Sequence, residues 1–541
     1  MIARTSTLQA TQLNQKTPIW NFGSRSLRSE IMHHRYPGTG SEDDPYIVSW
    51  MPADPEDPMQ FTLMKKITIT LVTAFACFIV SLSSSAYAGS THGVIAQFDI
   101  SKELATAGLS LFVLGFSVGP FIWAPLSESV GRQRPFLISL LGLAAFSGGC
   151  AGAQNIRTLL VLRFFGGSFG SSPLTNASGV ISDMFTARQR GLALLSFAST
   201  PYLEWKGPCL GPIIGGFLEM KAGWRWVEGF LSAIAALAWV LMFFFVPETY
   251  APVILRRRAK ELSCLTGKCY ESKLDLQIGK TVTITKRLKT VGLRPWMLLL
   301  REPIVLFLTI YAALIYGILY MLFEALPIVY EDYRGWNKGV ASLPFIGVMI
   351  GVFCGVIYSL YDNQRYTKMQ RQCTNGDSLA PEARLPPCMT ASLTIPAGLF
   401  WFAWTNSPSI HWLASVASLV PFGFGLLLVY MGIVNYLIDA YTIYSASVMA
   451  GMSVFRFVFG AVFPLFSNDM YRRLGIHWAS CIPAFLSVLC MPLPFLIYIY
   501  GPGIRKRCKY AALAEKHLRT VREVLVVTEH ADQPKLDSTL T

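Results

Sequence analysis

The seventh long apolar stretch of the chain contains one acid, Glu324, which follows Tyr320 by four residues and Tyr316 by eight. Residues four apart share one face of a helix, so these three side chains are expected to point the same way. A carboxylate between tyrosine rings attracts an organic cation, and a buried carboxylate can exchange a proton near neutral pH. We therefore expect Glu324, Tyr316 and Tyr320 to bind substrate or protons; the alternative is an interfacial glutamate at the end of a long span.

Two arginines also lie inside apolar stretches. Arg163 lies about six residues into the fourth stretch, and Arg456 lies near the middle of the eleventh. A charge at membrane depth is costly, so each must face water, a partner or a cavity. Arg163 lies ~9 Å from the end of its stretch, a distance that a long side chain can span, so its charge could instead reach the bilayer surface. Asn435 and Asp439, at the end of the tenth stretch, are weaker candidates that helix capping explains equally well.

The elements that must position these residues are membrane-spanning helices. Only 14% of the 541 residues are charged and 52% are hydrophobic, whereas soluble proteins carry about 25% charged residues. Apolar stretches of about 20 residues recur, each long enough for a hydrocarbon layer of about 30 Å. We expect an all-α membrane protein with twelve spans: 67–89, 104–125, 135–154, 158–184, 191–219, 224–247, 303–330, 339–361, 388–406, 411–438, 441–470 and 476–500.

The spans divide the chain into two six-helix halves. The expected organisation is a disordered tail (1–66), an N-terminal bundle (67–247), a basic linker (248–302), a C-terminal bundle (303–500) and a second tail (501–541). Residues 1–29 contain four basic residues and no acid, which also resembles a transit peptide. Basic residues gather before the first span, in the linker and after the last span, which indicates that both termini are cytoplasmic. The net charge of +14 thus reflects the membrane topology and gives the protein some affinity for anionic lipid. Nucleic-acid binding is not expected.

No cofactor chemistry is indicated. The seven histidines form no cluster in the sequence, so a metal-dependent membrane enzyme, a competing class, would lack a ligand set. No pair of cysteines lies on the outer side, so disulfides are not expected. Because no phosphate-binding loop is visible either, the proton gradient is the remaining energy source.

Small residues are spaced four apart in matching spans of the two halves. Gly207, Gly211 and Gly215 form such a face in the fifth span, and the eighth repeats it at Gly347, Gly351 and Gly355. These faces let another helix approach to backbone contact. Ordinary tight packing would explain any one of them. Their equivalent placement suggests two repeated bundles that meet through smooth surfaces and rock, the design of secondary transporters.

Several ordered motifs carry a family resemblance that covers about residues 54–507. They are GPCLGPIIGG at 207–216, APLSESVGRQR at 124–134, PETYAPV at 247–253, FEA at 323–325, PEARLPP at 381–387, YLIDAYTIY at 436–444 and DPEDP at 54–58. The chain resembles a twelve-span major facilitator superfamily transporter, and in particular the fungal drug:proton antiporters related to polyamine and cycloheximide-resistance exporters.

The resemblance implies roles for motif residues. It implies that Glu128, Gly131, Arg132 and Arg134 form a cytoplasmic latch, in which the acid contacts a helix N-terminus and arginines of the other half; the alternative is a solvated basic loop. It implies proton coupling by Arg163. The antiporter motif contributes Gly207, Pro208, Gly211, Pro212, Gly215 and Gly216.

The chain departs from the family pattern at Glu204, Trp205 and Lys206, which interrupt the approach to Gly207. Each charge would cost about 3 kcal/mol near the bilayer centre. Three extra residues would also rotate the part of the helix before them by about 300° about the helix axis, relative to the part after them. The insertion is either a genuine polar site or a misplaced splice boundary, and a genuine insertion would put transport itself in question. Glu128 also departs from the family pattern, which more often has aspartate at this position.

The expected function is export of amphipathic toxic small molecules across the plasma membrane in exchange for protons. The expected partners are a small-molecule substrate, protons and the lipid bilayer, with the chain acting as a monomer. The alternatives are a polyamine or nutrient carrier of the same fold, a transport-inactive paralogue, and a vacuolar instead of a plasma membrane location.

Overall fold

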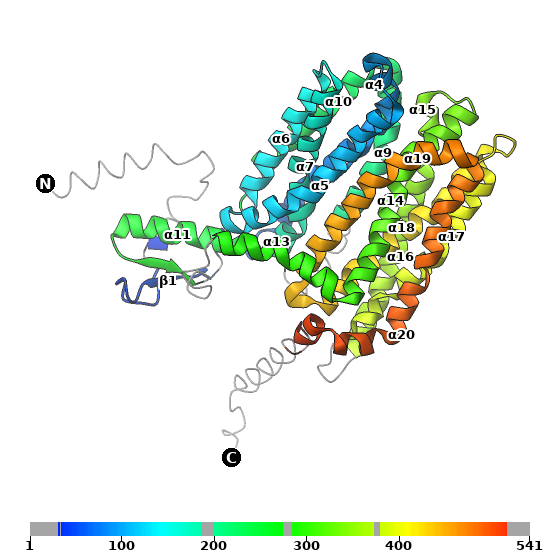
Figure 1. Cartoon of the computed structure of the whole chain (residues 1–541). Helices are drawn as coiled ribbons and strands as arrows, with labels where there is room; N and C mark the ends of the chain where they lie inside the picture. Colours follow the sequence, from blue (N-terminus) through cyan, green and yellow to red (C-terminus); the bar gives the residue numbers. More distant parts are fainter. Residues whose placement is uncertain are drawn as a thin grey trace. The chain divides into compact units, whose positions relative to one another are not determined.

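The computed structural model describes residues 31–32, 34–52, 54–185, 199–273, 284–372, 379–514 and 516 (Figure 1). The chain forms two compact units. One, the tail–linker unit, combines Met1–Asp57 with Ala251–Val282. The other, the helical body, combines Pro58–Tyr250 with Thr283–Thr541.

The tail–linker unit is built on a short parallel pair of strands. Strand β1 (Tyr46–Val48) pairs with β2 (Tyr270–Ser272), which follows helix α11 (Ala251–Thr266). A small apolar core joins the strand to the helix and contains Tyr36, Val48, Leu255, Ala259 and Leu262. The structure therefore differs from the expected disordered tail over the described part of residues 34–57, because the linker helix supplies an apolar face for that segment.

A buried ion pair adds to this core. Arg258 donates a bidentate hydrogen bond to Asp54, with Nη1 2.6 Å from Oδ2 and Nη2 3.1 Å from Oδ1. Nη2 also donates to Glu56 at 2.7 Å. The DPEDP motif and the basic linker thus contact each other, which places an aspartate and an arginine 204 residues apart in one network.

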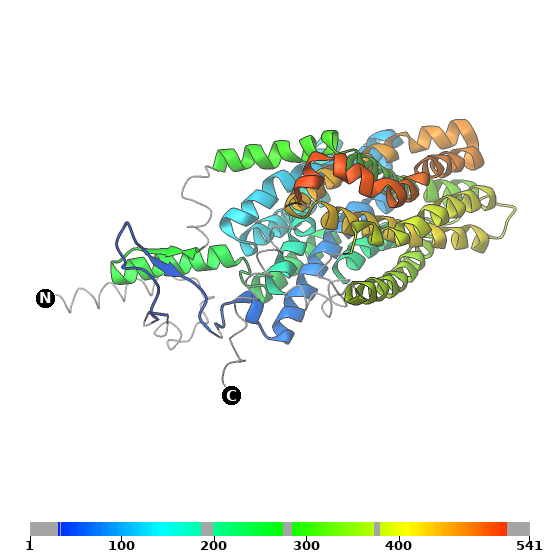
Figure 2. The same cartoon turned by 90° about the horizontal axis from the view of Figure 1, so that it is seen from below.

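In the described residues, the N-terminal half of the helical body holds six long helices (Figure 2, blue to green). They are α3 (Leu63–Ala86), α5 (Lys102–Val130), α6 (Gln133–Ala151), α7 (Ile156–Met184), α9 (Ser199–Ala222) and α10 (Trp224–Phe245), with the short η1 (Pro58–Gln60), η2 (Tyr87–Ser90) and α4 (Thr91–Phe98) beside them. Polar side chains begin several of these helices: Ser101 accepts from the backbone N–H of Leu104 and Asn155 from that of Thr158. Such caps satisfy amide groups that have no partner within the helix.

The C-terminal half repeats this plan (Figure 1, green to red). Its elements are α13 (Ile284–Arg301), α14 (Pro303–Pro327), η3 (Ile328–Tyr333), α15 (Lys338–Ala341), α16 (Phe345–Gln372), η4 (Pro381–Arg384), α17 (Pro386–Thr405), α18 (Trp412–Ala440), η5 (Thr442–Tyr444), α19 (Ser445–Cys490) and α20 (Pro492–Arg507). Gly475 has a φ of 72° and interrupts α19. Gly475 therefore separates the eleventh expected span from the twelfth, which continues past Cys490 into α20.

The expected spans fall on these helices. Eight helical stretches in the described residues are long and apolar enough to cross a membrane, and the last of them, Thr442–Arg507, contains the two spans that Gly475 separates. Helices α7, α9 and α17 supply the other three. Large apolar side chains point outwards, among them Leu141, Phe353 and Leu489, which are 54%, 56% and 76% exposed. Such an apolar surface suits a lipid environment.

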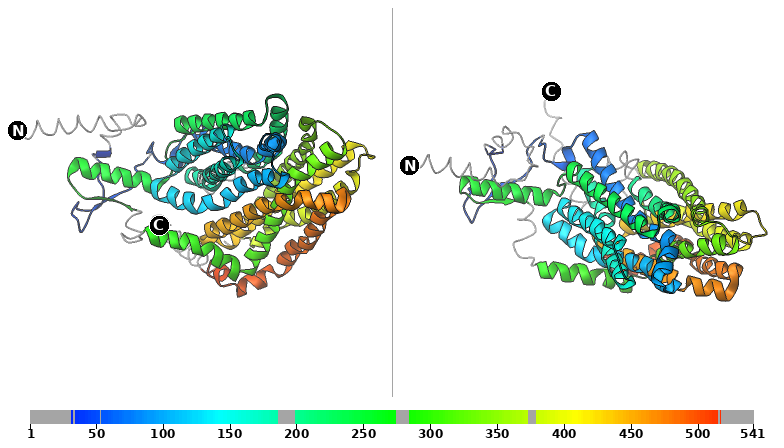
Figure 3. Two further views of the ribbon diagram at one scale, coloured as in Figure 1. Left: turned by 45° about the horizontal axis from the view of Figure 1, so that its top comes forward. Right: turned by 90° about the horizontal axis from the view of Figure 1, so that it is seen from above.

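The same helix pairs recur in both halves. Helix α3 packs on α9 as α14 packs on α19, and α5 packs on α7 as α16 packs on α18. Figure 3 shows that the long helices of each half lie side by side. These repeated pairings fit the prediction of two related bundles.

The glycine faces lie within each half and not between the halves. A Cβ at Gly211 would overlap Ser85 Oγ of α3, and one at Gly207 would lie 2.6 Å from Ser81 Cβ. In the other half, a Cβ at Gly351 would overlap the carbonyl oxygen of Val420 in α18. This differs from the expected rocking seam, because a glycine face specifies a close backbone neighbour without specifying which one. Gly347 and Gly355 face α18 in the same way, and Gly215 faces Ala86.

Glycines elsewhere do approach the opposite half. A Cβ at Gly216 would lie 2.8 Å from Ser342 Oγ, and one at Gly460 would lie 3.3 Å from Val113 Cγ1. Gly216 belongs to the antiporter motif, so one end of that motif reaches the other bundle. The prolines of the motif, Pro208 and Pro212, lie inside α9, which continues through them.

Candidate functional site

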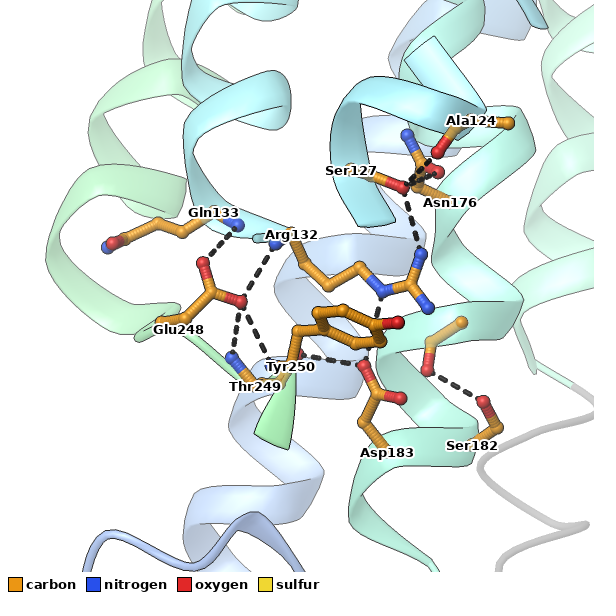
Figure 4. A network of polar contacts seen from close by, with 11 residues as sticks. Ala124, Ser127, Arg132, Gln133, Asn176, Ser182, Asp183, Glu248, Thr249 and Tyr250 are labelled. Carbon is orange, nitrogen blue, oxygen red and sulfur yellow. Dashed lines mark hydrogen bonds and ion pairs between the residues drawn. The ribbon is translucent and has the colours of Figure 1, made fainter. Parts of the chain in front are cut away.

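The loop between α5 and α6 places two backbone amides on one carboxylate (Figure 4). Glu248, just after α10, accepts from the backbone N–H of Arg132 at 2.8 Å and of Gln133 at 3.2 Å. It also accepts from the N–H groups of Thr249 and Tyr250, at 3.0 and 2.9 Å. An acid suits this position because the N-terminus of α6 carries unpaired N–H groups and a partial positive charge.

Gly131 makes this contact possible. Its φ is 99°, in the left-handed region, and a Cβ there would overlap the Glu248 carboxylate. The glycine of the loop is thus required both by its backbone conformation and by the close approach of Glu248.

The side chain of Arg132 connects three further residues in Figure 4. Its Nε lies 3.2 Å from Asp183 Oδ2 on α7, and its Nη1 donates to Ser127 Oγ at 2.9 Å. The guanidinium lies over the ring of Tyr250 at 4.7 Å. Arg132 therefore ties α5 and α7 to the chain that follows α10.

The contacts of this loop belong to one half. The resemblance implied that Glu128 contacts the other half, whereas Glu128 and Arg134 are exposed in the structure, and the described contacts of Arg132 stay within the N-terminal bundle. The sequence analysis missed Asp183 and Glu248. Glu248 stands in the quoted PETYAPV motif, which had no assigned role, and Asp183 is a lone acid at the end of α7.

Arg163 is buried and paired. It is 1% exposed, and its Nη1 donates to Glu228 Oε1 on α10 at 3.1 Å. It also donates to the carbonyl oxygens of Ser83 at 3.2 Å and Gly108 at 3.3 Å. Arg163 thus joins α3, α5, α7 and α10, and its side chain does not extend to the bilayer surface.

Two rings complete this site. The Arg163 guanidinium lies 4.5 Å from the centre of the Tyr87 ring and 4.4 Å from that of Phe112. Glu228 was missed by the sequence analysis, although it is the one acid in the expected span 224–247. The signal that selected Glu324, a lone acid in an apolar stretch, also identifies Glu228.

Arg456 lies in an aromatic cage near the middle of the body. Its guanidinium lies 4.9 Å from the Tyr316 ring, 4.6 Å from Tyr430 and 4.9 Å from Phe457. Arginine over aromatic faces is a stabilising arrangement, stronger when water is excluded. The sequence predicted a partner for Arg456 on another helix, and the rings of Tyr316 on α14 and Tyr430 on α18 are part of that partner.

Tyr316 and Tyr320 form a chain of hydroxyl groups. The Tyr316 hydroxyl donates to that of Tyr320 at 3.2 Å, and Tyr320 Oη lies 2.8 Å from Ser84 Oγ on α3. The rings themselves are 4.8 Å apart. The two tyrosines connect Arg456 in the C-terminal half with α3 in the N-terminal half.

Glu324 lies where α14 meets α5. It is 4% exposed, the hydroxyl of Thr106 is its hydrogen-bonding neighbour, and Lys102 and Glu103 act on it electrostatically. All three neighbours come from the opposite half. The structure therefore brings Glu324 to the interface between the bundles.

Polar contacts join the halves at the end of the body where α5 begins, called the far end here; the opposite end, with the α5–α6 loop, is the loop end. Four contacts form what we call the far-end clasp: Lys102–Asp332 (3.9 Å), His92–Glu331 (3.5 Å), Glu219–Lys338 (3.2 Å) and Glu103–Asn468 (2.9 Å). Each pairs a residue of the N-terminal half with one of the C-terminal half. The far end is closed in this structure.

The remaining candidates lie apart from these sites. Asp439 pairs with Arg384 of η4 at 3.1 Å, which gives it a local packing role, and Asn435 is half-buried on α18. Helix α9 continues through residues 204–206. The side chains of Glu204 and Trp205 lie outside the described residues, and Lys206 is half-buried.

Comparisons with known proteins give one consistent family. Residues 73–464 match the family model of the Major Facilitator Superfamily. The chain is 54% identical over 529 residues to the major facilitator superfamily multidrug transporter mdrA of Aspergillus fumigatus, which covers 97% of this chain and 86% of the relative. It is 46% identical over 506 residues to the efflux pump FUB11 of Gibberella moniliformis (94% and 84%), and 47% identical over 493 residues to the major facilitator-type transporter sorT of Penicillium rubens (90% and 93%).

Proposed function

Because the chain belongs to the major facilitator superfamily, we propose that it is an efflux transporter that exports amphipathic toxic small molecules, drugs or secondary metabolites in exchange for protons. Relatives that match nearly the whole chain bear the names multidrug transporter and efflux pump. The proposal takes the loop end as cytoplasmic, because basic residues gather in the linker and after the last span. It takes the plasma membrane as the location.

The observation that carries the proposal is the position of Glu324 between the halves. A carboxylate that is buried against α5 of the other bundle changes its surroundings whenever the bundles move apart. Proton binding at such a group is linked to the conformational equilibrium. A proton gradient can therefore drive movement through this residue, and a charge moved through 100 mV supplies ~2.3 kcal/mol.

The aromatic residues nearby favour an amphipathic substrate. The rings of Tyr316 and Phe457 lie against Arg456, and the hydroxyl of Tyr320 contacts Ser84 of α3. Rings of this kind offer apolar area and a hydroxyl group at low conformational cost.

The charges argue against a polycation as the principal substrate. Glu228 is neutralised by Arg163, and Glu324 has Lys102 in its vicinity. Arg456 adds a buried positive charge. A polyamine would need an excess of acids at the site, so we place the polyamine carrier second.

The test is transport of a fluorescent amphipathic cation by the purified full chain in liposomes. An imposed proton gradient should drive accumulation on the acidic side, and a proton ionophore should abolish it. Glu324→Gln should lower gradient-driven flux at least tenfold. The matched control is Asp99→Asn, an exposed acid with φ 49°, where asparagine tolerates the same backbone conformation.

Spermidine competition separates the alternatives. An exporter of amphipathic molecules keeps its flux in excess spermidine, whereas a polyamine carrier loses it. Wild-type chain that moves neither compound under a proton gradient would refute the proposal and favour the transport-inactive paralogue.

A further inference from the structure

The tail–linker unit contains a hollow that is lined by cations and aromatic rings. Its volume is about 350 Å³, which lies in the range of small-molecule sites. Both parts of the unit contribute to the wall, which consists of His34, Arg35, Tyr36 and Tyr46 from the tail and Lys268 and Tyr270 from the linker. No acid is among these described lining residues, so the wall offers an anion positive charge and no carboxylate.

The rings of the wall form a row. Tyr46 and Tyr270 are partners in the β1–β2 pair, and their ring centres are 5.0 Å apart. Tyr36 meets Tyr270 edge-on at 5.9 Å, and His34 meets Tyr36 edge-on at 4.9 Å. Contacts between aromatic rings in these orientations are stabilising, and Tyr36 is buried in the core of the unit. The packing of the unit therefore preorganises the wall of the hollow.

Cations lie at both ends of this row. The ammonium group of Lys268 lies 5.5 Å from the centre of the Tyr46 ring, and Arg35 follows His34 at the other end. Arg35 and Lys268 are exposed, and neither forms an ion pair within the described part of the chain. The buried Arg258 of the same unit, by contrast, already binds two carboxylates. The charges at the hollow are thus available to a ligand.

We propose that this hollow, called the headgroup site below, binds a cytoplasmic ligand that carries two or more phosphate groups, either a soluble inositol phosphate or the headgroup of a phosphoinositide lipid. The proposal goes beyond the proposed function, from which it takes only the cytoplasmic position of the linker. Binding at the headgroup site requires neither the exported substrate nor a proton gradient.

The chemistry of the lining residues selects this class of ligand. A guanidinium binds phosphate oxygens through two parallel hydrogen bonds, and an ammonium adds a compact positive charge. Since Arg35 and Lys268 flank opposite ends of the row, a ligand with two phosphates engages both cations, whereas inorganic phosphate engages one. The tyrosines between them offer apolar area and hydroxyl groups to the ring that carries the phosphates.

Such a ligand should stabilise the contact between the tail and the linker. Arg35 belongs to the segment before the first span, and Lys268 belongs to the segment between the two halves. A ligand that binds only when both segments are in place stabilises the folded unit by mass action, by a factor of about 1 + [L]/Kd. Opening of the unit should therefore become about tenfold rarer at a ligand concentration of ten times Kd.

The test is hydrogen–deuterium exchange of the full chain in nanodiscs of neutral lipid, at about 0.15 M salt to screen weak attraction. The reporter peptides cover residues 34–48 and 262–272. Inositol trisphosphate at ten times the Kd from titration calorimetry should slow exchange in both peptides about tenfold. Inorganic phosphate at the same concentration should have no effect.

A further arm identifies the source of the phosphates. In it the nanodiscs contain phosphatidylinositol bisphosphate and no soluble ligand is added. Protection in this arm and with inositol trisphosphate shows that the site accepts the headgroup from either source. Protection by the lipid alone assigns the site to the membrane surface, and protection by the soluble ligand alone assigns it to a free inositol phosphate.

A matched pair of double variants tests the residues. Arg35→Gln/Lys268→Gln should weaken binding of inositol trisphosphate at least about tenfold, because it removes both charged donors. The control Arg257→Gln/Lys260→Gln removes two exposed cations of α11 that do not line the hollow, and its affinity should stay within about twofold of wild type. Exchange without ligand should be the same in all three proteins, which shows that the unit still folds.

A conservative variant separates charge from folding. Lys268→Arg keeps the positive charge at an exposed position, so it should bind inositol trisphosphate nearly as well as wild type. Loss of binding in Lys268→Arg equal to that in Arg35→Gln/Lys268→Gln would contradict a role for the charge.

Three other results would overturn the inference: no protection by either the trisphosphate or the lipid, equal protection by inorganic phosphate, and equal loss of affinity in the two double variants. A chain that binds inositol trisphosphate but exports no substrate would refute the proposed function and leave the headgroup site intact.

Discussion

Arg163 of α7 and Glu228 of α10 form an ion pair, 3.1 Å from Nη1 to Oε1, in which the two side chains are 1% and 0% exposed. Both residues belong to the N-terminal half, so the pair does not depend on contact between the halves. Its environment is enclosed by α3, α5, α7 and α10, which suits a fixed structural element of the bundle better than a mobile coupling site.

Removal of either partner should destabilise the protein strongly. Arg163→Met or Glu228→Leu leaves a buried charge without hydration or a counter-ion, at a cost of about 3–5 kcal/mol. The double variant should recover most of that loss, because neither charge remains. Thermal unfolding of the detergent-solubilised chain, followed by size-exclusion chromatography, measures the effect.

The partly exposed pair Arg384–Asp439 is the comparison pair. Its side chains are 21% and 32% exposed, so either single substitution should cost about 1 kcal/mol or less. Strictly additive losses in the Arg163→Met/Glu228→Leu double variant would contradict the assignment of a coupled buried pair.

Alanine substitutions at two glycines should distinguish a closely packed position from an open one. In Gly351→Ala the new methyl group overlaps the Val420 carbonyl oxygen and lies 2.7 Å from the backbone nitrogen of Phe424. We expect a loss of about 1–3 kcal/mol, typical of overpacking. Gly229→Ala is the control, because no atom apart from the neighbouring backbone of its own helix lies within 4 Å of its Cβ position, and alanine is favoured over glycine in a helix by about 1 kcal/mol. Equal melting temperatures for the two variants would contradict the close approach of α16 and α18.

The hydrogen bonds between Glu248 and the start of α6 yield a third prediction. Glu248→Ala leaves the N–H groups of Arg132 and Gln133 without their acceptor, and we expect a loss of about 1–3 kcal/mol in stability. Gly131→Ala should show a similar defect, since its φ is 99° and its Cβ meets the same carboxylate. Arg134→Gln, at an exposed position in the first turn of α6, should stay within about 0.5 kcal/mol of wild type. A larger effect of Arg134→Gln than of Glu248→Ala on thermal stability would refute this ranking.

The tail–linker unit should lose structure in acid. Burial by itself would raise the pKa of Asp54, but hydrogen bonds from Arg258 and from the backbone N–H of Glu56 outweigh burial and hold that pKa below its ordinary value. A carboxyl group with a lowered folded-state pKa stabilises the fold above its unfolded pKa, and that contribution is lost as the pH falls through the folded pKa.

Hydrogen exchange of peptides from β1 and α11 should therefore stay slow at neutral pH and rise below about pH 4, after correction for intrinsic rates. Asp54→Asn should exchange faster at neutral pH and respond less to acid. Exchange in β1 that is the same for wild type and Asp54→Asn at neutral pH would show that the ion pair with Arg258 does not stabilise the unit.

The sequence predicted the helical architecture because the bilayer imposes a local rule. Each crossing needs about 20 apolar residues in a row, so 67–89 and 303–330 could be identified without knowledge of their neighbours. The same rule exposes charges that break it, which is why Arg163, Glu324 and Arg456 were found. Glu228 breaks the rule in the same way, and the sequence analysis missed it.

Contacts between distant segments were decided by the tertiary structure. Glu324 meets Lys102 and Thr106, more than 200 residues earlier in the chain, and no local pattern encodes that meeting. Likewise, the face of Gly207 and Gly211 predicts that some backbone comes close, and only the fold shows that it belongs to α3 of the same half. The sequence by itself determines which segments enter the bilayer, since hydrophobicity is a property of each residue. The partners of a buried charge or a glycine depend on how the helices pack against each other, and that arrangement exists only in the folded chain.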